Sequence, residues 1–317
     1  MRAFLFDQYG YYPPHEDDSE FELEGWTFKL EAIQDQKEEE LQSLNDFLQR
    51  LMQLFPTMGA QIITNRKGTF ISEDDYGKVI LVATKKQKMR IQDIIKIHQH
   101  YVNSPSEIPY TTTYLSSLWE EKINSIEQKI LPSIRVDDFA YQKIMVAAIY
   151  ALGLAENALQ YLTEIAIDYG KEISPLTLSH RRLESLDSHT VFDPLNLILD
   201  SPIRDIAEAW KYKVITTTEL LQILPTYQLS IKEVSLLFAR MLFPTRFFDL
   251  LEKHYGERVD VRKQILAYYR EMNQDLLELK KVEQLLVKNY GVRPISWLLN
   301  AYIKPYDYDL IFSKFNT

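Results

Sequence analysis

The sequence predicts an α+β protein with a small mixed part, residues 1–84, and a larger helical part, residues 85–317. Between residues 20 and 33 apolar and polar residues alternate, which is the period of a half-buried strand. Beyond residue 90 apolar residues recur every three to four positions, as on one face of a helix. The basic segment Lys85–Arg90 lies between the two patterns, so we place the boundary there.

The first part is predicted to fold as two strands, a helix and three more strands. Phe21 and Leu23 alternate with polar residues before Glu24-Gly25, and the alternation resumes at Trp26, which indicates a hairpin. A helix follows, because leucines and phenylalanines recur at helical spacing behind an acidic first turn, where the helix dipole favours acids. The helix is expected over residues 36–55, and the later strands over 60–64, 69–72 and 79–83.

The second part is predicted to be almost entirely helical. Its longest apolar run, residues 144–155, is much shorter than the roughly 20 residues that a membrane span needs, so we expect a buried core helix and no span. A short extended piece at 174–178 and an irregular loop to about 203 interrupt the helices. Helices are expected at 91–102, 113–131, 137–152, 156–169, 204–212, 218–224, 230–242, 246–255, 259–289 and 294–302.

Composition excludes several classes of function. The net charge of -9 argues against a nucleic-acid-binding surface, which needs concentrated basic residues. The absence of cysteine removes disulfides, thiol nucleophiles and cysteine-ligated zinc. The chain has 9 glycines, less than half of the usual share of about 7%, so a glycine-rich phosphate loop is not expected. No segment has the pattern of a targeting signal, so we expect an intracellular protein.

The common metal and nucleophile motifs are absent. His98 and His100 are two positions apart on a predicted helix, so they point to different faces and cannot share a metal. We expect both to be polar surface histidines. No Gly-x-Ser-x-Gly elbow and no HExxH pair occurs.

Residues 174–208 have a distinctive order of polar residues. A hydrophobic strand leads into His180 and a loop, and Asp193 follows a hydrophobic pair. Twelve residues later Arg204-Asp205 opens a helix. This order resembles the catalytic segment of the aminoglycoside/choline phosphotransferase branch of the protein-kinase-like superfamily. That family has a His-Gly-Asp-Leu-His-x-x-Asn loop, then a hydrophobic-Asp-Phe-Asp motif, then Arg-Asp before an Ala.

The resemblance implies a protein-kinase-like, aminoglycoside phosphotransferase type bilobal fold. The strand and helix order of residues 20–84 resembles the small β-rich N-lobe, and residues 85–317 would be the mostly helical C-lobe. Residues 150–161 and 200–210 are similar to the bacterial spore-coat members of this branch, the CotS and YutH group, and fit the YutH members best. That resemblance implies a role in sporulation, in the mother-cell cytoplasm and then in the forming spore coat, with other coat or coat-assembly proteins as partners.

The family motif, carried over residue by residue, implies a degenerate site. His180 matches the loop histidine, and Asp205 matches the Asp that braces the loop. Arg182 falls where the family has its catalytic Asp, and an Arg cannot accept a proton. Asp187 falls where the metal-binding Asn would be, and Asp193 falls on the metal-binding Asp. We expect the Arg182 guanidinium to pair with Asp193 or Asp187, in place of a metal.

A weaker correspondence involves the first part of the chain. Lys29 lies on the strand that would carry the phosphate-binding lysine, and Glu39 or Glu40 could be its partner on the following helix. A strand lysine that faces solvent is the more ordinary interpretation.

The sequence favours a catalytically inactive pseudokinase that acts as a scaffold or binding module and needs no cofactor. One alternative is an active small-molecule phosphotransferase that uses ATP and magnesium, with Asp187 and Asp193 as metal ligands. The other alternative is a regulator that binds nucleotide without turnover. Arg182 argues against the first alternative, because it occupies the place of the catalytic base. Loss of the base alone need not abolish phosphoryl transfer, because that reaction depends mostly on positioning and charge neutralisation.

Overall fold

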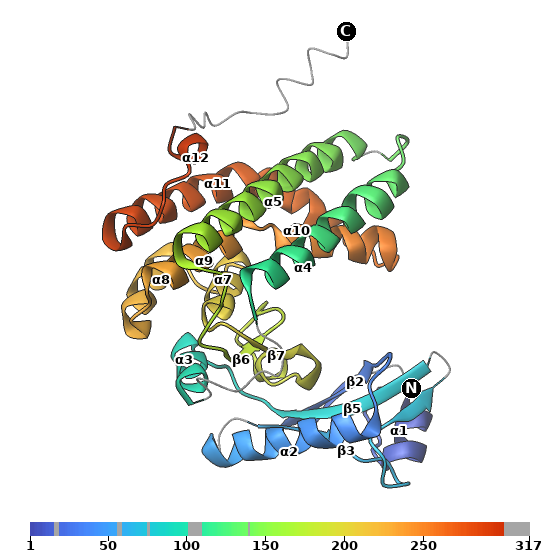
Figure 1. The fold of residues 1–317 in the computed structure, drawn as a ribbon. Helices are drawn as coiled ribbons and strands as arrows, with labels where there is room; N and C mark the ends of the chain where they lie inside the picture. The colour runs from blue at the N-terminus through green and yellow to red at the C-terminus, as the bar shows by residue number, and fades with distance from the viewer. Residues whose placement is uncertain (16–18, 56–58, 75–76, 101–109, 139, 301–317) are drawn as a thin grey trace. The chain divides into compact units, whose positions relative to one another are not determined.

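The computed structural model describes the chain except residues 16–18, 56–58, 75–76, 101–109, 139 and 301–317. The chain forms two compact units, which we term the sheet unit, residues 1–104 and 176–205, and the helical unit, residues 105–175 and 206–317 (Figure 1). Segments 85–104 and 176–205, which sequence analysis assigned to the helical part, thus belong with the sheet. The predicted helix ends at residues 102 and 302 lie outside the described residues.

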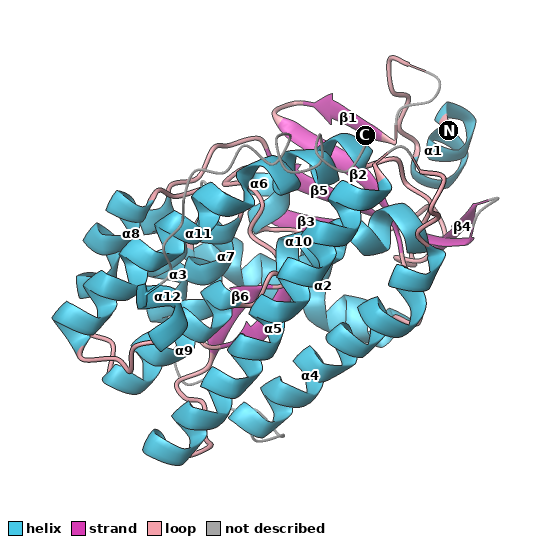
Figure 2. Ribbon diagram, turned by 90° about the horizontal axis from the view of Figure 1, so that it is seen from above, coloured by secondary structure: helices cyan, strands magenta, loops and turns pink. Residues whose placement is uncertain are grey.

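The sheet unit is built on an antiparallel sheet, as the sequence predicts. Figure 2 shows its main strands side by side, in the order β1-β2-β5-β3, with β4 paired to the beginning of β5. Glu24 and Gly25 connect β1 to β2 with φ values of 51° and 80°, which fits a two-residue turn with two positive φ angles and explains the glycine. The strands are β1 (Glu20–Leu23), β2 (Trp26–Ala32), β3 (Ala60–Ile63), β4 (Ser72–Asp74) and β5 (Gly77–Lys85).

One face of the sheet is covered by a short helix, α1 (Arg2–Tyr9), that the sequence analysis did not predict. Its Leu5 is fully buried in a cluster with Phe21, Phe28 and Leu81. The Phe21 and Phe28 rings stack with their centroids 5.0 Å apart. The apolar residues of α1 are mostly consecutive in the sequence, so they lack the helical period that would have predicted the helix.

The predicted acidic helix is α2 (Glu38–Leu54), and it packs along β3. Leu41, Leu48 and Leu51 form its buried stripe. Asn45 is also buried on this side, and its Oδ1 accepts a hydrogen bond from the Ile62 backbone N–H over 2.8 Å. This bond satisfies a strand donor on β3.

The rest of the sheet unit carries most of the polar motif described for residues 174–208. β6 (Thr177–His180) and β7 (Leu197–Asp200) pair antiparallel and form the only sheet among the described residues beyond residue 90. The sequence predicted an extended piece at 174–178, but β7 lies where an irregular loop was expected. Helix α3 (Ile91–His100) packs against β6. A one-turn helix, α6 (Ser188–Val191), lies within the connection between the two strands.

The helical unit confirms the predicted class, with one correction. The sequence predicted two helices at 137–152 and 156–169, but α5 runs unbroken through Gly153. A glycine inside a helix costs only about 1 kcal/mol, and burial of Leu152, Leu154 and Ala155 around it offsets that cost. The helices are α4 (Thr112–Ser125), α5 (Tyr141–Tyr169), α7 (Ile203–Lys211), α8 (Thr217–Ile223), α9 (Ile231–Leu242), α10 (Thr245–Leu251), α11 (Arg262–Tyr290) and α12 (Ser296–Asn300).

Helix α5 is the centre of this unit. Among the described residues it is the one helix long and apolar enough, by length and composition alone, to cross a membrane. In the structure it packs against α4, α9 and α11, and Ala147, Ala151, Ala155 and Ala158 are fully buried. We therefore interpret α5 as a core helix, whose small residues allow its neighbours to approach closely.

Candidate functional site

The candidate site lies in the loop between β6 and β7, residues 181–196, which we term the site loop. Backbone bonds attach it to the segment that follows β5. Met89 N donates to Leu186 O over 2.7 Å, and Ser188 N donates to Gln87 O over 2.9 Å. The loop is therefore held against the end of the central strand rather than being free to rearrange by itself.

The base of the site loop is braced by a buried carboxylate. Asp205 Oδ1 accepts a hydrogen bond from the His180 backbone N–H over 2.8 Å. Asp205 Oδ2 lies 2.6 Å from His180 Nδ1 and 2.9 Å from His98 Nε2. All three side chains are at most 1% exposed. Asp205 lies in the first turn of α7, so this helix reaches back to hold the end of β6.

The surroundings of His180 favour its charged form. Nδ1 faces the Asp205 carboxylate, and Nε2 lies 2.8 Å from the Val191 carbonyl oxygen, so both ring nitrogens face acceptors and both need a proton. Burial by itself lowers the pKa of His180, but the charge and hydrogen bond of Asp205 outweigh it, and the pKa is raised above 6.5. Burial raises the pKa of Asp205, but His180 and then His98 lower it well below its ordinary value.

The expectation that His98 is a surface histidine is wrong. Its side chain is 1% exposed, and its ring bonds Asp205. Ile91, Ile94 and Ile95 are buried on the same helix, and His98 falls at the spacing of that apolar stripe. The helical period could have placed His98 inside, and the partner that makes burial acceptable is supplied by α7.

Two further side chains, which the sequence analysis did not single out for this role, clamp the main chain of the site loop. Asn196 Oδ1 accepts from Arg182 N over 2.9 Å, and its Nδ2 donates to Arg182 O over 2.7 Å. Arg204 Nε donates to His180 O over 2.8 Å, and its Nη1 lies 2.8 Å from Asp200 Oδ2. Arg204 directly precedes Asp205 in the sequence motif, so the Arg-Asp pair could have indicated that Arg204 also contacts the site loop. Asn196 had none, because its partner lies 14 positions away.

The contacts of Asp187 and Asp193 do not include the expected pairing with Arg182. Neither Asp187 nor Asp193 forms an ion pair or hydrogen bond with Arg182 among the described residues. Arg182 Nη1 instead donates to the Arg181 carbonyl oxygen over 2.7 Å. The Asn196 clamp fixes the Arg182 main chain, and Asp193 faces a different set of residues.

That set comes from strand β2. Lys29 Nζ lies 2.8 Å from Glu31 Oε1, and Glu31 is 10% exposed. The Glu31 carboxyl is within hydrogen-bonding reach of the Asp193 carboxyl, and the Lys29 charge also acts on Asp193. Asp193 Oδ1 accepts from Leu195 N over 2.9 Å, which caps the turn at residues 194–196. We term Lys29, Glu31 and Asp193 the carboxyl cluster.

The carboxyl cluster holds a proton near neutral pH. Burial, followed by the charge and hydrogen bond of Glu31, raises the pKa of Asp193 to about 7, although Leu195 N–H and Lys29 oppose the rise. Burial lowers the pKa of Lys29, but its pairing with Glu31 and the charge of Asp193 raise it above the ordinary value. Asp193 therefore shares its surroundings with a second acid, Glu31, and with one ammonium group, that of Lys29.

The remaining predicted site residues are less closely connected. Glu39 and Glu40 are exposed on α2, and Glu40 caps the backbone N–H of Lys37 over 3.3 Å. The partner of Lys29 is thus Glu31, two positions along the same strand, where the period of two puts both side chains on one face. The Asp187 carbonyl oxygen begins α6 by accepting from Thr190 N and Val191 N. Within the described ranges no three His, Asp or Glu side chains are arranged to hold a metal ion.

Comparisons with known proteins place the chain in a family. The crystal structure of an aminoglycoside phosphotransferase from Alicyclobacillus acidocaldarius subsp. acidocaldarius DSM 446 is similar with a TM-score of 0.49 and 13% identity, over 83% of this chain and 87% of that one. The endospore coat-associated protein YutH of Bacillus subtilis (strain 168) is 25% identical over 160 residues, which are 44% of this chain and 43% of the relative. The chain therefore aligns with less than half the length of that relative.

A family model gives the broader match. The model described as spore coat putative kinase YutH matches residues 3–288. This range contains the site loop and nearly all of the sheet unit and of the described helical unit. The chain therefore belongs to the YutH family of spore coat putative kinases.

Proposed function

We propose that this protein is a catalytically inactive kinase-like protein that acts as a scaffold or binding module in spore coat assembly. Membership of a spore coat family and similarity to an endospore coat-associated protein support the setting. The observation that carries the lack of catalysis is Arg182, a permanent cation in the loop position where the resembling enzymes have their catalytic Asp.

The surroundings of Arg182 support this proposal. The resembling enzymes need a carboxylate there to accept the proton of the attacking hydroxyl. Asn196 and Arg204 form four hydrogen bonds to the main chain of His180, Arg181 and Arg182, which stabilise the end of β6 and the beginning of the site loop. Asp193, the remaining candidate metal ligand, is engaged by Glu31 and carries a proton over part of the neutral range.

A second candidate is a protein that binds nucleotide without turnover. The observation in its favour is that Lys29 and Asp193 act on one another electrostatically, so a cation from β2 and a candidate metal ligand from the site loop share one neighbourhood. A phosphate would have to draw Lys29 away from Glu31, and magnesium would have to displace the proton of the carboxyl cluster.

We predict that the purified protein neither hydrolyses ATP nor phosphorylates aminoglycosides, choline or itself above the background rate. The measurement is release of labelled phosphate with ATP and magnesium, beside an active phosphotransferase. The Asp193→Ala variant is the control, because contaminating activity does not depend on it. Turnover that the wild type shows and Asp193→Ala loses would contradict the proposal.

The scaffold role is tested separately, by complementation in a spore-forming host that lacks its own copy of the gene. Wild type, Lys29→Met and Asp193→Ala are expected to restore coat assembly equally, provided that each accumulates to the same level. Thermal denaturation with and without ATP and magnesium separates the two candidates: a ligand at 100 times its dissociation constant stabilises by about 2.7 kcal/mol, so an Asp193-dependent shift would favour nucleotide binding. Loss of complementation by both variants, with folding intact, would contradict a purely structural role.

A further inference from the structure

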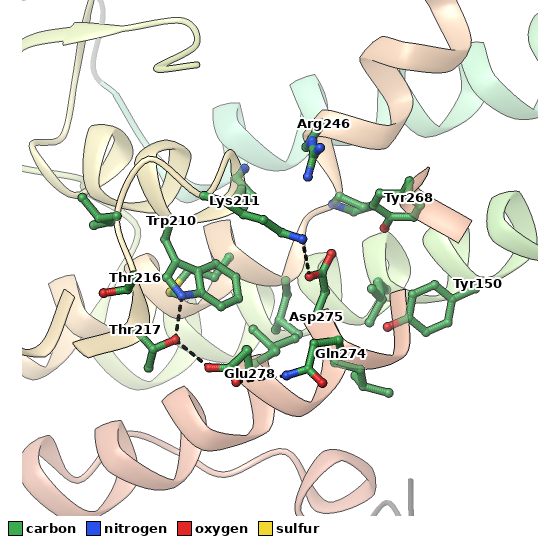
Figure 3. Close-up of a pocket in the computed structure, with 18 residues that line it drawn as sticks. Tyr150, Trp210, Lys211, Thr216, Thr217, Arg246, Tyr268, Gln274, Asp275 and Glu278 are labelled. Atoms are coloured by element: carbon green, nitrogen blue, oxygen red, sulfur yellow. Dashed lines mark hydrogen bonds and ion pairs between the residues drawn. The ribbon is translucent and has the colours of Figure 1, made fainter. Parts of the chain in front are cut away.

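The helical unit contains a cavity that the proposed function does not use. It has a volume of about 410 Å³, within the range of small-molecule sites. All of its lining residues belong to the helical unit, and they come from α5, the end of α7, the beginning of α8, the end of α9, α10 and α11. Figure 3 shows the side chains that converge on it.

Most of the wall is apolar. Leu154, Met241, Leu242 and Leu279 form its aliphatic part, and each is at most 9% exposed. Tyr150, Trp210 and Tyr268 add three aromatic rings to the wall (Figure 3). Such a wall favours the hydrocarbon or aromatic body of a ligand over a sugar or a free ion.

Most polar groups in the wall already bond each other. Trp210 Nε1 donates to Thr217 Oγ1 over 3.2 Å, and Thr217 Oγ1 donates to Glu278 Oε2 over 2.9 Å. On the other side Lys213 Nζ lies 3.1 Å from Asp275 Oδ1. These groups shape the cavity, but they already bond one another and are less available to a ligand.

Arg246 is the exception. Its Nη1 is buried and has no hydrogen-bond partner among the described residues. Figure 3 shows the guanidinium directed toward the part of the cavity lined by Asp275 and Tyr268. A buried N–H group without an acceptor destabilises the protein, and more so when it is charged, so a ligand that supplies the acceptor removes this penalty when it binds.

The charges around Arg246 indicate how much negative charge the ligand can carry. Lys213 is already shared between Glu271 and Asp275. Burial raises the pKa of Asp275 although Lys213 opposes the rise. The hydrogen bond of Lys281 lowers the pKa of Glu278, so this acid keeps its charge. One guanidinium with an unbonded Nη1 suits a single negative charge, and repulsion from Glu278 disfavours a dianion.

We propose that this cavity binds a small amphipathic carboxylate, with its carboxylate on Arg246 and its apolar body between α5, α9 and α11. A guanidinium can donate two parallel hydrogen bonds to one carboxylate, which fixes the orientation of the ligand. The occupant would make the helical unit responsive to a metabolite or lipid-derived acid.

The test uses decanoate as the probe, with isothermal titration calorimetry on the full chain. Decanoate is expected to bind, and decanol and decyl phosphate are expected to bind at least tenfold more weakly. Arg246→Met is expected to lower the affinity for decanoate at least tenfold and to leave the affinity for decanol unchanged. Arg246→Lys is expected to retain part of the affinity for decanoate. The matched control is Arg262→Met, an exposed α11 arginine paired with Asp260 outside the cavity.

A second measurement applies even if Arg246→Met does not fold. 10-Bromodecanoate is expected to quench tryptophan fluorescence in the wild type, and the quenching is expected to disappear in Trp210→Phe. Decanoate that binds neither the wild type nor Arg246→Lys would overturn the proposal. Equal affinity of the wild type and Arg246→Met, tighter binding of decyl phosphate, or quenching that survives in Trp210→Phe would also overturn it.

Discussion

Replacement of Asp205 by Ala is expected to lower the free energy of unfolding by about 3–5 kcal/mol, the cost of breaking a buried ion pair. The substitution leaves His180 Nδ1, His98 Nε2 and the His180 backbone N–H without their shared acceptor in a site closed to water. Urea denaturation at pH 6 measures the difference. The matched control is Asp187→Ala in the site loop, which is expected to cost less than about 1 kcal/mol because Asp187 makes no side-chain ion pair among the described residues.

The Asp205→Asn variant tests the charge separately from the shape. In the wild type the lowered pKa of Asp205 contributes stability above pH 3.8, and that stability is lost as the pH falls through the folded-state value. The raised pKa of His180 contributes stability below pH 6.5, and that stability is lost as the pH rises through the folded-state value. The pair therefore contributes most between about pH 4 and 6.5.

In the Asp205→Asn variant, the stability is expected to fall, not rise, as the pH decreases from about 7 to about 4. The amide NH₂ group can face the two ring nitrogens only when both histidines are neutral, so protonation below about pH 6.5 should destabilise the folded variant. The NMR titration of His180 is expected to move below 6.5 in Asp205→Asn. Parallel stability profiles for wild type and variant between pH 4 and 7 would show that the pair is not charged.

Replacement of Asp193 by Asn is expected to stabilise the protein at pH 8 by about 1–3 kcal/mol and to change its stability little near pH 4. The folded wild type holds a proton on Asp193 up to about pH 7, whereas the unfolded chain releases it near 3.8. The folded state therefore binds more protons across this window, and its stability falls as the pH rises. The Asn side chain stays neutral, and its NH₂ group can donate to Glu31.

The comparison is made by urea denaturation of both proteins at each half pH unit from 4.5 to 8.5. Asp187→Asn, in the same loop, is the control and is expected to follow the wild type throughout. Glu31→Gln is expected to lower the pKa of Asp193, because it removes the neighbouring charge. An Asp193→Asn profile that stays parallel to the wild type up to pH 8.5 would show that the carboxyl cluster holds no proton.

The sequence by itself determined the features that depend on local period and turn chemistry. Alternation of polar and apolar residues located β1 and β2, the continuous apolar run at 79–83 located β5, and the acidic first turn located α2. The Glu24-Gly25 turn followed from the need for positive φ angles. The order of His180 and Arg204-Asp205 led to the family, because spacing along the chain is the property that a family motif preserves.

Only the tertiary structure decided which of these residues meet. Glu31 and Asp193 are far apart in the chain, and their carboxyls approach because the site loop is held against the sheet by bonds to Gln87 and Met89. The Arg182 main chain is fixed by hydrogen bonds to Asn196, and the buried ring of His98 is bonded to Asp205. The protonation of these groups follows from burial and neighbouring charge, which arise from contacts between distant segments and have no local period in the sequence.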